Sequence, residues 1–363
     1  MPTSIRCRSC DERIVLNSRT EDAEELRCPN CGAHVVVRRR GRERDDDYDD
    51  RPRPRRRQSG TGTGTKILIG LLVGGLLLVL VCAGAGFGLW RWMAAPTSFP
   101  EQTEDYAQAR QKFRTKLTRQ AAAPQTWDRL ELPEDADEIV YKSGALQLKA
   151  WVSKPKPNGG RSPAVLFLHG GFAFGEDDWD QAEPFREAGY VVMTPMLRGE
   201  NGLPGHYSMF YDEVEDVLAA AEALAKRPGV DGQKLYVAGH SVGGTLALLA
   251  AMTTNRFRAA ASFSGSPDQV KWARGQPNVV PFDLADQREF QMRSPLAFSR
   301  SFKCPTRIYY GDEELLFSAA SQKTAQQAKA AGLDVEAVSV PGDHMTAVEP
   351  AMVKCIEFFR QHP

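Results

Sequence analysis

From about residue 128 onward, short apolar runs alternate with longer amphipathic ones, and no other feature constrains the fold as strongly. Runs such as AVLFLHG and KLYVAG are typical of buried strands. Residues 211–229 have helical periodicity, with acidic residues early and basic residues late. Strands that alternate with helices form a mostly parallel sheet covered on both faces. We therefore predict one α/β domain over residues 128–363.

The loop after one of these strands contains a candidate nucleophile. GHSVG, residues 239–243, lies between a predicted strand and a predicted helix and fits the G-x-S-x-G elbow. Gly239 and Gly243 allow the backbone to pack closely around a strained Ser241. The motif alone leaves a second interpretation open, in which Ser241 only caps the helix, because G-x-S-x-G recurs by chance.

Two other loops supply the groups that would activate a serine. His344 follows the last predicted strand, and an imidazole there can accept the serine proton and later protonate a leaving group. Asp312, Glu313 and Glu314 follow the preceding strand, and any of them could orient the histidine. The order serine, acid, histidine is the one that this architecture uses.

Acyl transfer also requires hydrogen-bond donors for a developing oxyanion. The N–H of Val242, directly after Ser241, is one candidate. A second comes from the HGGF turn after the first core strand, where we expect the N–H of Gly171, with that of Phe172 as the alternative. The simpler interpretation of this glycine pair is a tight turn without a catalytic role.

Together these segments resemble a known family. LFLHGG, RGENG, GHSVGG, YYGDEELLF and PGDH are similar to the catalytic domain of the prolyl oligopeptidase family and to dienelactone-hydrolase-like enzymes, over about residues 135–361. The resemblance implies an α/β-hydrolase fold with a Ser-His-acid triad. Relatives commonly have G-x-x-D after the acid strand, so G-D-E-E puts Glu314 at the acid position, with Asp312 as the alternative.

The stretch 266–304 between two core strands is longer than a simple crossover. Its Trp272, Phe282 and Phe290 could line a substrate pocket or form the core of a lid. Cys304 could form a disulfide with Cys355, which the sequence alone leaves open.

Residues 1–37 contain two C-x-x-C pairs, Cys7 with Cys10 and Cys28 with Cys31. Two such turns complete the four-sulfur shell of a structural Zn²⁺ ion, and the 17 residues between the pairs fit this spacing. The segment resembles the N-terminal zinc ribbons of many bacterial proteins. Two redox pairs or two disulfides are the alternatives, but no thioredoxin-like pattern accompanies them.

The middle of the chain predicts a membrane anchor. Residues 38–65 are charged or Gly/Thr-rich and predict a disordered linker. Residues 67–90 are 24 consecutive uncharged residues, within a predicted transmembrane helix at 66–92. Eleven Lys or Arg residues lie between positions 38 and 66, which predicts a cytoplasmic N-terminus and an extracytoplasmic catalytic domain. A cleaved signal peptide is the alternative. Residues 93–127 then predict a stalk with an amphipathic helix.

These observations predict a membrane-anchored serine hydrolase that cleaves esters or short peptides through an acyl-enzyme. With 46 basic and 46 acidic residues, the chain has no excess positive charge that would suggest nucleic acid binding. The zinc ribbon would be structural and could bind a cytoplasmic protein partner. The alternative function is a membrane sensor in which a hydrolase fold binds a ligand without catalysis.

Overall fold

The computed structural model describes residues 4–7, 13–15, 25–28, Cys31, 34–36, 100–154 and 160–363. They fall in two compact units, which we describe separately. The predicted linker and the predicted membrane span at 67–90 lie outside the described residues. Within the ranges that the structure describes, no helix has both the length and the apolarity to cross a membrane.

The N-terminal unit contains two short antiparallel hairpins. Strand β1 (Ser4–Arg6) pairs with β2 (Arg13–Val15), and β3 (Glu25–Arg27) pairs with β4 (His34–Val36). Strands β2 and β4 each follow one of the C-x-x-C pairs in the sequence.

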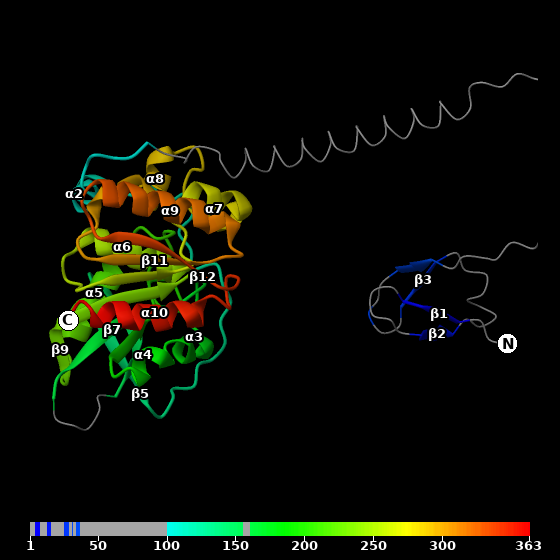
Figure 1. Ribbon diagram of the computed structural model, residues 1–363, viewed down its shortest axis with the longest axis horizontal. Helices are drawn as coiled ribbons and strands as arrows, with labels where there is room; N and C mark the ends of the chain where they lie inside the picture. Colours follow the sequence, from blue (N-terminus) through cyan, green and yellow to red (C-terminus); the bar gives the residue numbers. More distant parts are fainter. Residues whose placement is uncertain are drawn as a thin grey trace, which may run out of the picture. The chain divides into compact units, whose positions relative to one another are not determined.

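The second unit is built on one eight-stranded sheet. Its strands are β5 (Ala136–Ser143), β6 (Leu146–Ser153), β7 (Ser162–Leu168), β8 (Val191–Pro195), β9 (Val230–His240), β10 (Ala260–Phe263), β11 (Thr306–Gly311) and β12 (Val335–Val340). The spatial order is β12-β11-β10-β9-β7-β8-β6-β5, and the pairs from β8 to β12 are parallel (Figure 1). The mostly parallel α/β sheet that the sequence predicts is therefore confirmed.

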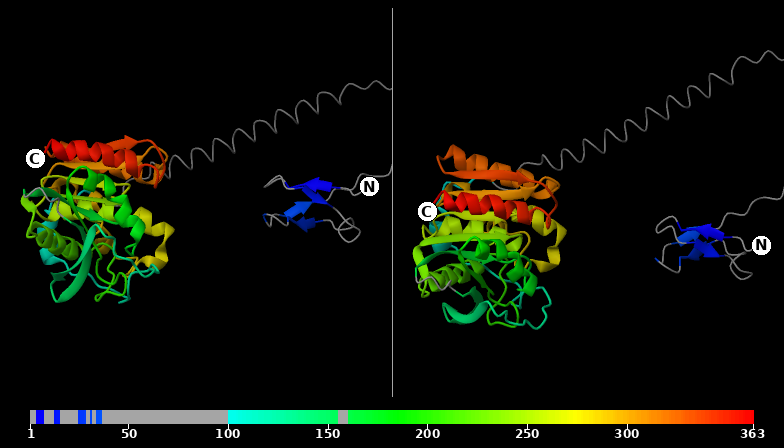
Figure 2. Two further views of the ribbon diagram at one scale, coloured as in Figure 1. Left: turned by 90° about the horizontal axis from the view of Figure 1, so that it is seen from below. Right: turned by 60° about the horizontal axis from the view of Figure 1, so that its bottom comes forward.

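Helices cover both faces of this sheet. One face carries α5 (Glu213–Ala225), α6 (Val242–Thr253) and α9 (Leu315–Ala330), and the other carries α4 (Glu183–Glu187) and α10 (Val348–Arg360), with α3 (Glu176–Gln181) next to α4 (Figures 1 and 2). Strand β7 shows why both faces are filled. Val165 and Phe167 pack with Phe185 on the α4/α10 side, whereas Leu166 and Leu168 point to the α5/α6 side. From Ala164 to Leu168 every residue of β7 is buried, which explains this continuous apolar run.

The long crossover after β10 folds into short helices. They are α7 (Gln269–Gly275), the 3₁₀ turn Pro277–Val279, α8 (Gln287–Gln291) and the 3₁₀ segment Pro295–Ser301.

The N-terminal part of this unit corrects the prediction of a stalk. Helix α2 (Tyr106–Lys112) buries Tyr106 and Ala109 completely, and the Tyr106 hydroxyl donates to the Met292 carbonyl at 2.8 Å. The amphipathic spacing at 101–120 is thus satisfied by packing against the α/β domain, so the described part of this segment does not stand apart from it.

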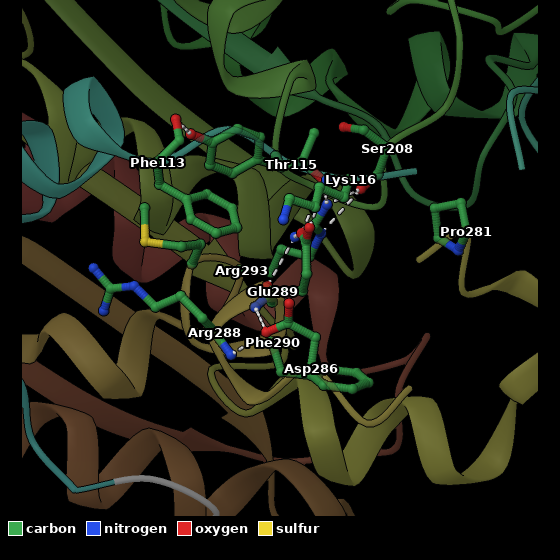
Figure 3. A network of polar contacts seen from close by, with 12 residues as sticks. Phe113, Thr115, Lys116, Ser208, Pro281, Asp286, Arg288, Glu289, Phe290 and Arg293 are labelled. Carbon is green, nitrogen blue, oxygen red and sulfur yellow. Dashed lines mark hydrogen bonds and ion pairs between the residues drawn. The ribbon is translucent and has the colours of Figure 1, made fainter. Parts of the chain in front are cut away.

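Beyond α2, a buried polar network fixes the same segment to the crossover (Figure 3). The carboxylate of Glu289 accepts from the Thr115 hydroxyl at 2.8 Å and from the Lys116 N–H at 2.6 Å. Arg293, which is 0% exposed, pairs with Glu289 and donates to the Ser208 carbonyl at 3.0 Å. Each charge is paired inside the domain, as buried ionic groups require. The segment that follows is therefore anchored close to the carboxyl ends of the strands.

Candidate active site

A sharp turn between β9 and α6 presents Ser241 at the carboxyl end of the sheet. Ser241 has φ +53°, a left-handed conformation that a residue with a side chain rarely adopts. Both Gly239 and Gly243 lie so close to other backbone atoms that a side chain would not fit at either position. A Cβ on Gly239 would lie 2.4 Å from the Gly243 carbonyl oxygen, and one on Gly243 would lie 2.0 Å from the Leu168 carbonyl oxygen. This is the geometry of a nucleophile elbow.

Three side chains from three loops form one hydrogen-bonded chain at this turn. His344 Nε2 lies 2.9 Å from Ser241 Oγ, and His344 Nδ1 lies 2.6 Å from Glu314 Oε1. Because a carboxylate only accepts hydrogen bonds, Nδ1 carries the proton and Nε2 accepts from the serine hydroxyl. The structure therefore brings together the predicted serine, histidine and acid.

The environment of Glu314 keeps it charged. Burial raises the pKa of this carboxyl, but hydrogen bonds from His344, the Ser264 hydroxyl and the Gly311 N–H outweigh burial and leave the pKa below its usual value. The alternative acid, Asp312, is exposed and accepts instead from the Gly342 N–H at 2.9 Å. Of the two acids, Glu314 is the one that contacts the histidine.

His240, the second residue of the elbow motif, holds the loop of His344. Its Nε2 donates to the His344 carbonyl at 2.9 Å. Burial lowers the pKa of His240 to about 4, so its imidazole is neutral at pH 7. A neutral ring with the proton on Nε2 can make this bond without adding charge beside His344.

The predicted oxyanion donors lie close to Ser241. Val242 is the first residue of α6, and Gly171 lines the pocket that contains Ser241 and His344. The N–H of Phe172 donates to the side-chain oxygen of Gln125 at 2.8 Å. The Phe172 N–H is thus already occupied by a side-chain carbonyl oxygen from residues 100–127, which we call the N-terminal segment.

His169 supports the turn that carries Gly171 and Phe172. Its Nδ1 lies 2.8 Å from the Gly170 carbonyl oxygen, and its Nε2 lies 3.0 Å from a Glu200 carboxylate oxygen. Burial lowers the pKa of His169, but the charge and hydrogen bond of Glu200 outweigh burial and raise it to about 9. Both ring nitrogens therefore donate, and the cationic imidazole fixes the turn.

Two pockets meet at Ser241. The first, which we call the wide pocket, has a volume of about 590 Å³. Its walls include His344, Gly171, and Gln125 and Trp127 of the N-terminal segment. Asp128, Glu176 and Asp177 also line it.

The second, which we call the tight pocket, has about 10 Å³ of free volume. It is lined by Phe210, Ser241, Val242, Thr245, Ser264, Ser266, Gln269, Trp272 and Phe317. Three aromatic rings therefore surround a space of about one water molecule beside the candidate nucleophile.

The aromatic residues of the crossover divide between the two roles that the sequence left open. Trp272 lines the tight pocket, with its ring 5.8 Å from that of Phe210. Phe282 and Phe290 are buried against each other, 4.9 Å between ring centroids, and belong to the core.

Cys304 and Cys355 are free thiols, so they do not form the disulfide that the sequence left open.

Sequence reasoning missed several residues of this site. Gln125 was hidden because AAAPQ indicates only the end of a helix, and nothing local connects it with the turn after β7. His240 occupies the variable position of G-x-S-x-G, so the motif gives it no weight. Gln269 is the first residue of α7, after the N-cap residue Asp268. An N-cap residue predicts the start of a helix and gives no information about a pocket.

The N-terminal unit brings three of the four predicted zinc ligands together. The ligand atoms of Cys7, Cys28 and Cys31 all lie within 4.8 Å of one another, and the Cys7 and Cys31 sulfur atoms are 3.6 Å apart. Tetrahedral Zn–S bonds of about 2.3 Å require sulfur separations of roughly 3.8 Å, so the three thiols fit such a shell. Cys10, the predicted fourth ligand, lies outside the described residues.

Comparisons with known proteins agree with the hydrolase-like geometry. Residues 178–300 match the model of the prolyl oligopeptidase family. The uncharacterized peptidase YtmA of Bacillus subtilis is 24% identical over 192 residues, which cover 48% of this chain and 72% of YtmA.

Solved structures share the fold at lower identity. A puromycin-hydrolyzing peptidase of Mycobacterium tuberculosis superposes with a TM-score of 0.54 at 22% identity, covering 62% of this chain and 39% of that one. An esterase of Pyrococcus furiosus has a TM-score of 0.54 at 17% identity, covering 67% and 98%. The chain spans about two fifths of the peptidase structure. These likenesses show the fold and, with the family match, support the α/β-hydrolase superfamily.

Proposed function

We propose, from the premise that this chain carries an α/β-hydrolase domain, that it is a serine hydrolase acting on esters or short peptides. In the first step, His344 Nε2 removes the proton of the Ser241 hydroxyl while Ser241 Oγ attacks the substrate carbonyl. Glu314 holds the Nδ1–H of His344 and stabilises the imidazolium that forms. The N–H of Val242, with that of Gly171 or Phe172, would stabilise the oxyanion.

Collapse of the tetrahedral intermediate breaks the bond to the leaving group, which takes its proton from His344 Nε2. The acyl group then remains on Ser241 Oγ as an ester. In the second step, His344 removes a proton from water, the resulting hydroxide equivalent attacks the acyl carbon, and Ser241 recovers its proton. The net reaction is hydrolysis of one ester or amide bond.

The observation that carries this proposal is the unbroken hydrogen-bonded chain Ser241–His344–Glu314 on a strained elbow. A surface serine or a simple helix cap would need neither the left-handed φ nor a carboxylate-bound imidazole. The relatives, a peptidase and an esterase by name, support hydrolysis without deciding between the two substrates.

A fluorophosphonate probe tests the proposal directly on the full chain in detergent. We expect one phosphonylated residue, Ser241, located by peptide mass spectrometry, and no labelling of Ser241→Ala. Turnover of p-nitrophenyl acetate should disappear in the same variant. Folded wild-type protein that neither binds the probe nor turns over the ester would instead favour the non-catalytic sensor.

We also propose that residues 67–90 anchor the protein in a membrane with the hydrolase domain outside the cytoplasm. The support is the uncharged stretch and the eleven basic residues between positions 38 and 66. In sealed inside-out vesicles, protease added outside should remove residues 1–65 and leave the hydrolase domain intact. Digestion of the hydrolase domain in these vesicles would contradict this orientation.

The cysteine cluster supports a structural zinc site with Cys10 as its fourth ligand. Metal analysis of the purified chain should find about one Zn²⁺ per molecule, and fewer in Cys28→Ser. Because zinc would stabilise only the N-terminal unit, esterase activity should survive the loss of the metal. A Cys304→Ser variant, altered in the other unit, serves as the control and should keep its zinc.

A further inference from the structure

Gln269, one of the residues that line the tight pocket, carries a buried hydrogen-bond acceptor that the described part of the protein does not satisfy. Gln269 is 0% exposed, and its Oε1 has no hydrogen-bond partner within the described part of the chain. Burying an unsatisfied amide oxygen is costly, and such groups in folded proteins call for an explanation.

The Gln269 side chain is held in one orientation by its other contacts. Nε2 donates to the Ser266 carbonyl at 2.7 Å, and the backbone N–H of Gln269 donates to Ser294 Oγ at 3.0 Å. Because a carbonyl can only accept, the nitrogen of the amide must face Ser266. The remaining atom, Oε1, is therefore an acceptor fixed in place before any ligand arrives.

The rest of the pocket restricts what this acceptor could bind. The rings of Phe210, Trp272 and Phe317 supply apolar walls, and the free volume of about 10 Å³ has room for one or two non-hydrogen atoms. The hydroxyls of Thr245, Ser264 and Ser266 also line the pocket, but each already donates to a protein carbonyl or carboxylate oxygen. Gln269 Oε1 is therefore the fixed polar group that is left to select a ligand. A matching substituent is small and carries a hydrogen-bond donor.

The position of His344 tells which part of the substrate enters this pocket. A leaving group must receive its proton from His344 Nε2, and His344 lines the wide pocket. The lining of the tight pocket includes the oxyanion candidate Val242 and does not include His344. The acyl part of the substrate then lies against the tight pocket, while the leaving group extends into the wide one.

We infer that the tight pocket is an acyl subsite that selects a small donor-bearing substituent next to the carbonyl, such as the hydroxymethyl group of a seryl residue. Gln269 Oε1 accepts the hydrogen bond from that substituent. This inference rests on the proposed function of Ser241 and names the substrate class of the same site.

A matched pair of substrates tests it on the full chain in detergent. The thiobenzyl esters of N-acetyl-L-serine and N-acetyl-L-2-aminobutyrate have equal numbers of non-hydrogen atoms and differ in a hydroxyl against a methyl group. We expect kcat/KM about five- to tenfold higher for the seryl ester, the value of one hydrogen bond. An equal or reversed ratio in the wild-type protein overturns the inference, with no variant required.

Gln269→Met keeps the length of the side chain and removes the amide, so it should abolish the seryl preference. Gln181→Met is the matched control, because Gln181 Oε1 is also buried without a partner among the described residues but lies outside both pockets. A preference that survives Gln269→Met, or that is lost equally in Gln181→Met, contradicts the inference.

Labelling with the fluorophosphonate distinguishes failure of the inferred acyl subsite from failure of the proposed function. Wild-type protein that binds a fluorophosphonate at Ser241 but cleaves both esters equally overturns the acyl subsite alone. Folded protein that is not labelled and cleaves neither ester overturns the proposed function and, with it, the subsite.

Discussion

The two pockets that meet at Ser241 differ in size, in lining and in origin. The wide pocket of about 590 Å³ takes part of its wall from exposed residues of the N-terminal segment, among them Trp127, which is 51% exposed. The tight pocket of about 10 Å³ is formed by residues of the crossover and of the core, with Gln269 fully buried.

This difference indicates that the two pockets beside Ser241 differ in how strictly they select the groups that they bind. A close-packed pocket discriminates between substituents that differ by one atom, because its walls adapt little. An open pocket with exposed walls tolerates many groups. We therefore expect strict acyl selection and permissive leaving groups, and the predictions below test this contrast.

The largest effect should come from the hydrogen-bonded chain that serves both pockets. Glu314→Gln should lower kcat by about 10³–10⁴-fold for every substrate, because the amide no longer stabilises the imidazolium of His344. Asp312→Asn is the control and should change kcat less than twofold, since Asp312 is exposed and does not contact the histidine. Steady-state kinetics with p-nitrophenyl acetate measures both. The reverse result would make Asp312 the acid.

The turn that lines the wide pocket, at Gly170 and Gly171, should depend on the charge of His169. Folding raises the pKa of His169 from 6.5 to about 9, so the protonated imidazole stabilises the folded state. This stabilisation is fully present below pH 6.5 and is lost as the pH rises through 9. The free energy of unfolding should thus fall by on the order of 2 kcal/mol over this range. Urea denaturation of wild type and His169→Gln measures it, and the variant should lack this fall. An equal fall in both would assign it to other groups.

Removing one wall of the tight pocket should relax acyl selection. Trp272→Ala should raise the ratio of kcat/KM for p-nitrophenyl octanoate over acetate about tenfold or more, because long chains gain apolar contacts in the larger space. Trp127→Ala makes the same change in the wide pocket and should leave this ratio unaltered. If Trp127→Ala shifts the ratio and Trp272→Ala does not, the assignment of the two pockets must be exchanged.

The smallest effect should come from Gln125, whose side-chain oxygen occupies the Phe172 N–H. Gln125→Ala should raise kcat/KM about two- to fivefold, because the substrate oxygen would no longer compete with an internal carbonyl. Thr126→Ala, a change at the neighbouring residue of the same wall, should have no effect. A fall in Gln125→Ala would mean that Gln125 stabilises the turn instead of blocking it.

Most elements of the α/β domain could be predicted because strand and helix periodicity is a local property. The β7 and β9 runs are apolar since both faces of a central strand are buried, and G-x-S-x-G marks a turn where backbone must approach backbone. The serine, histidine and acid candidates followed from the rule that ligands bind at the carboxyl ends of parallel strands.

The sequence by itself therefore determined the layered fold, Ser241, His344 and a short list of acids. Only the tertiary structure decided that Glu314 contacts His344, that the segment after residue 100 packs on the domain, and that Gln125 and Gln269 lie beside Ser241. The physical reason is that these contacts join residues far apart in the chain. Their geometry depends on how whole elements pack, and no local pattern of residues records it.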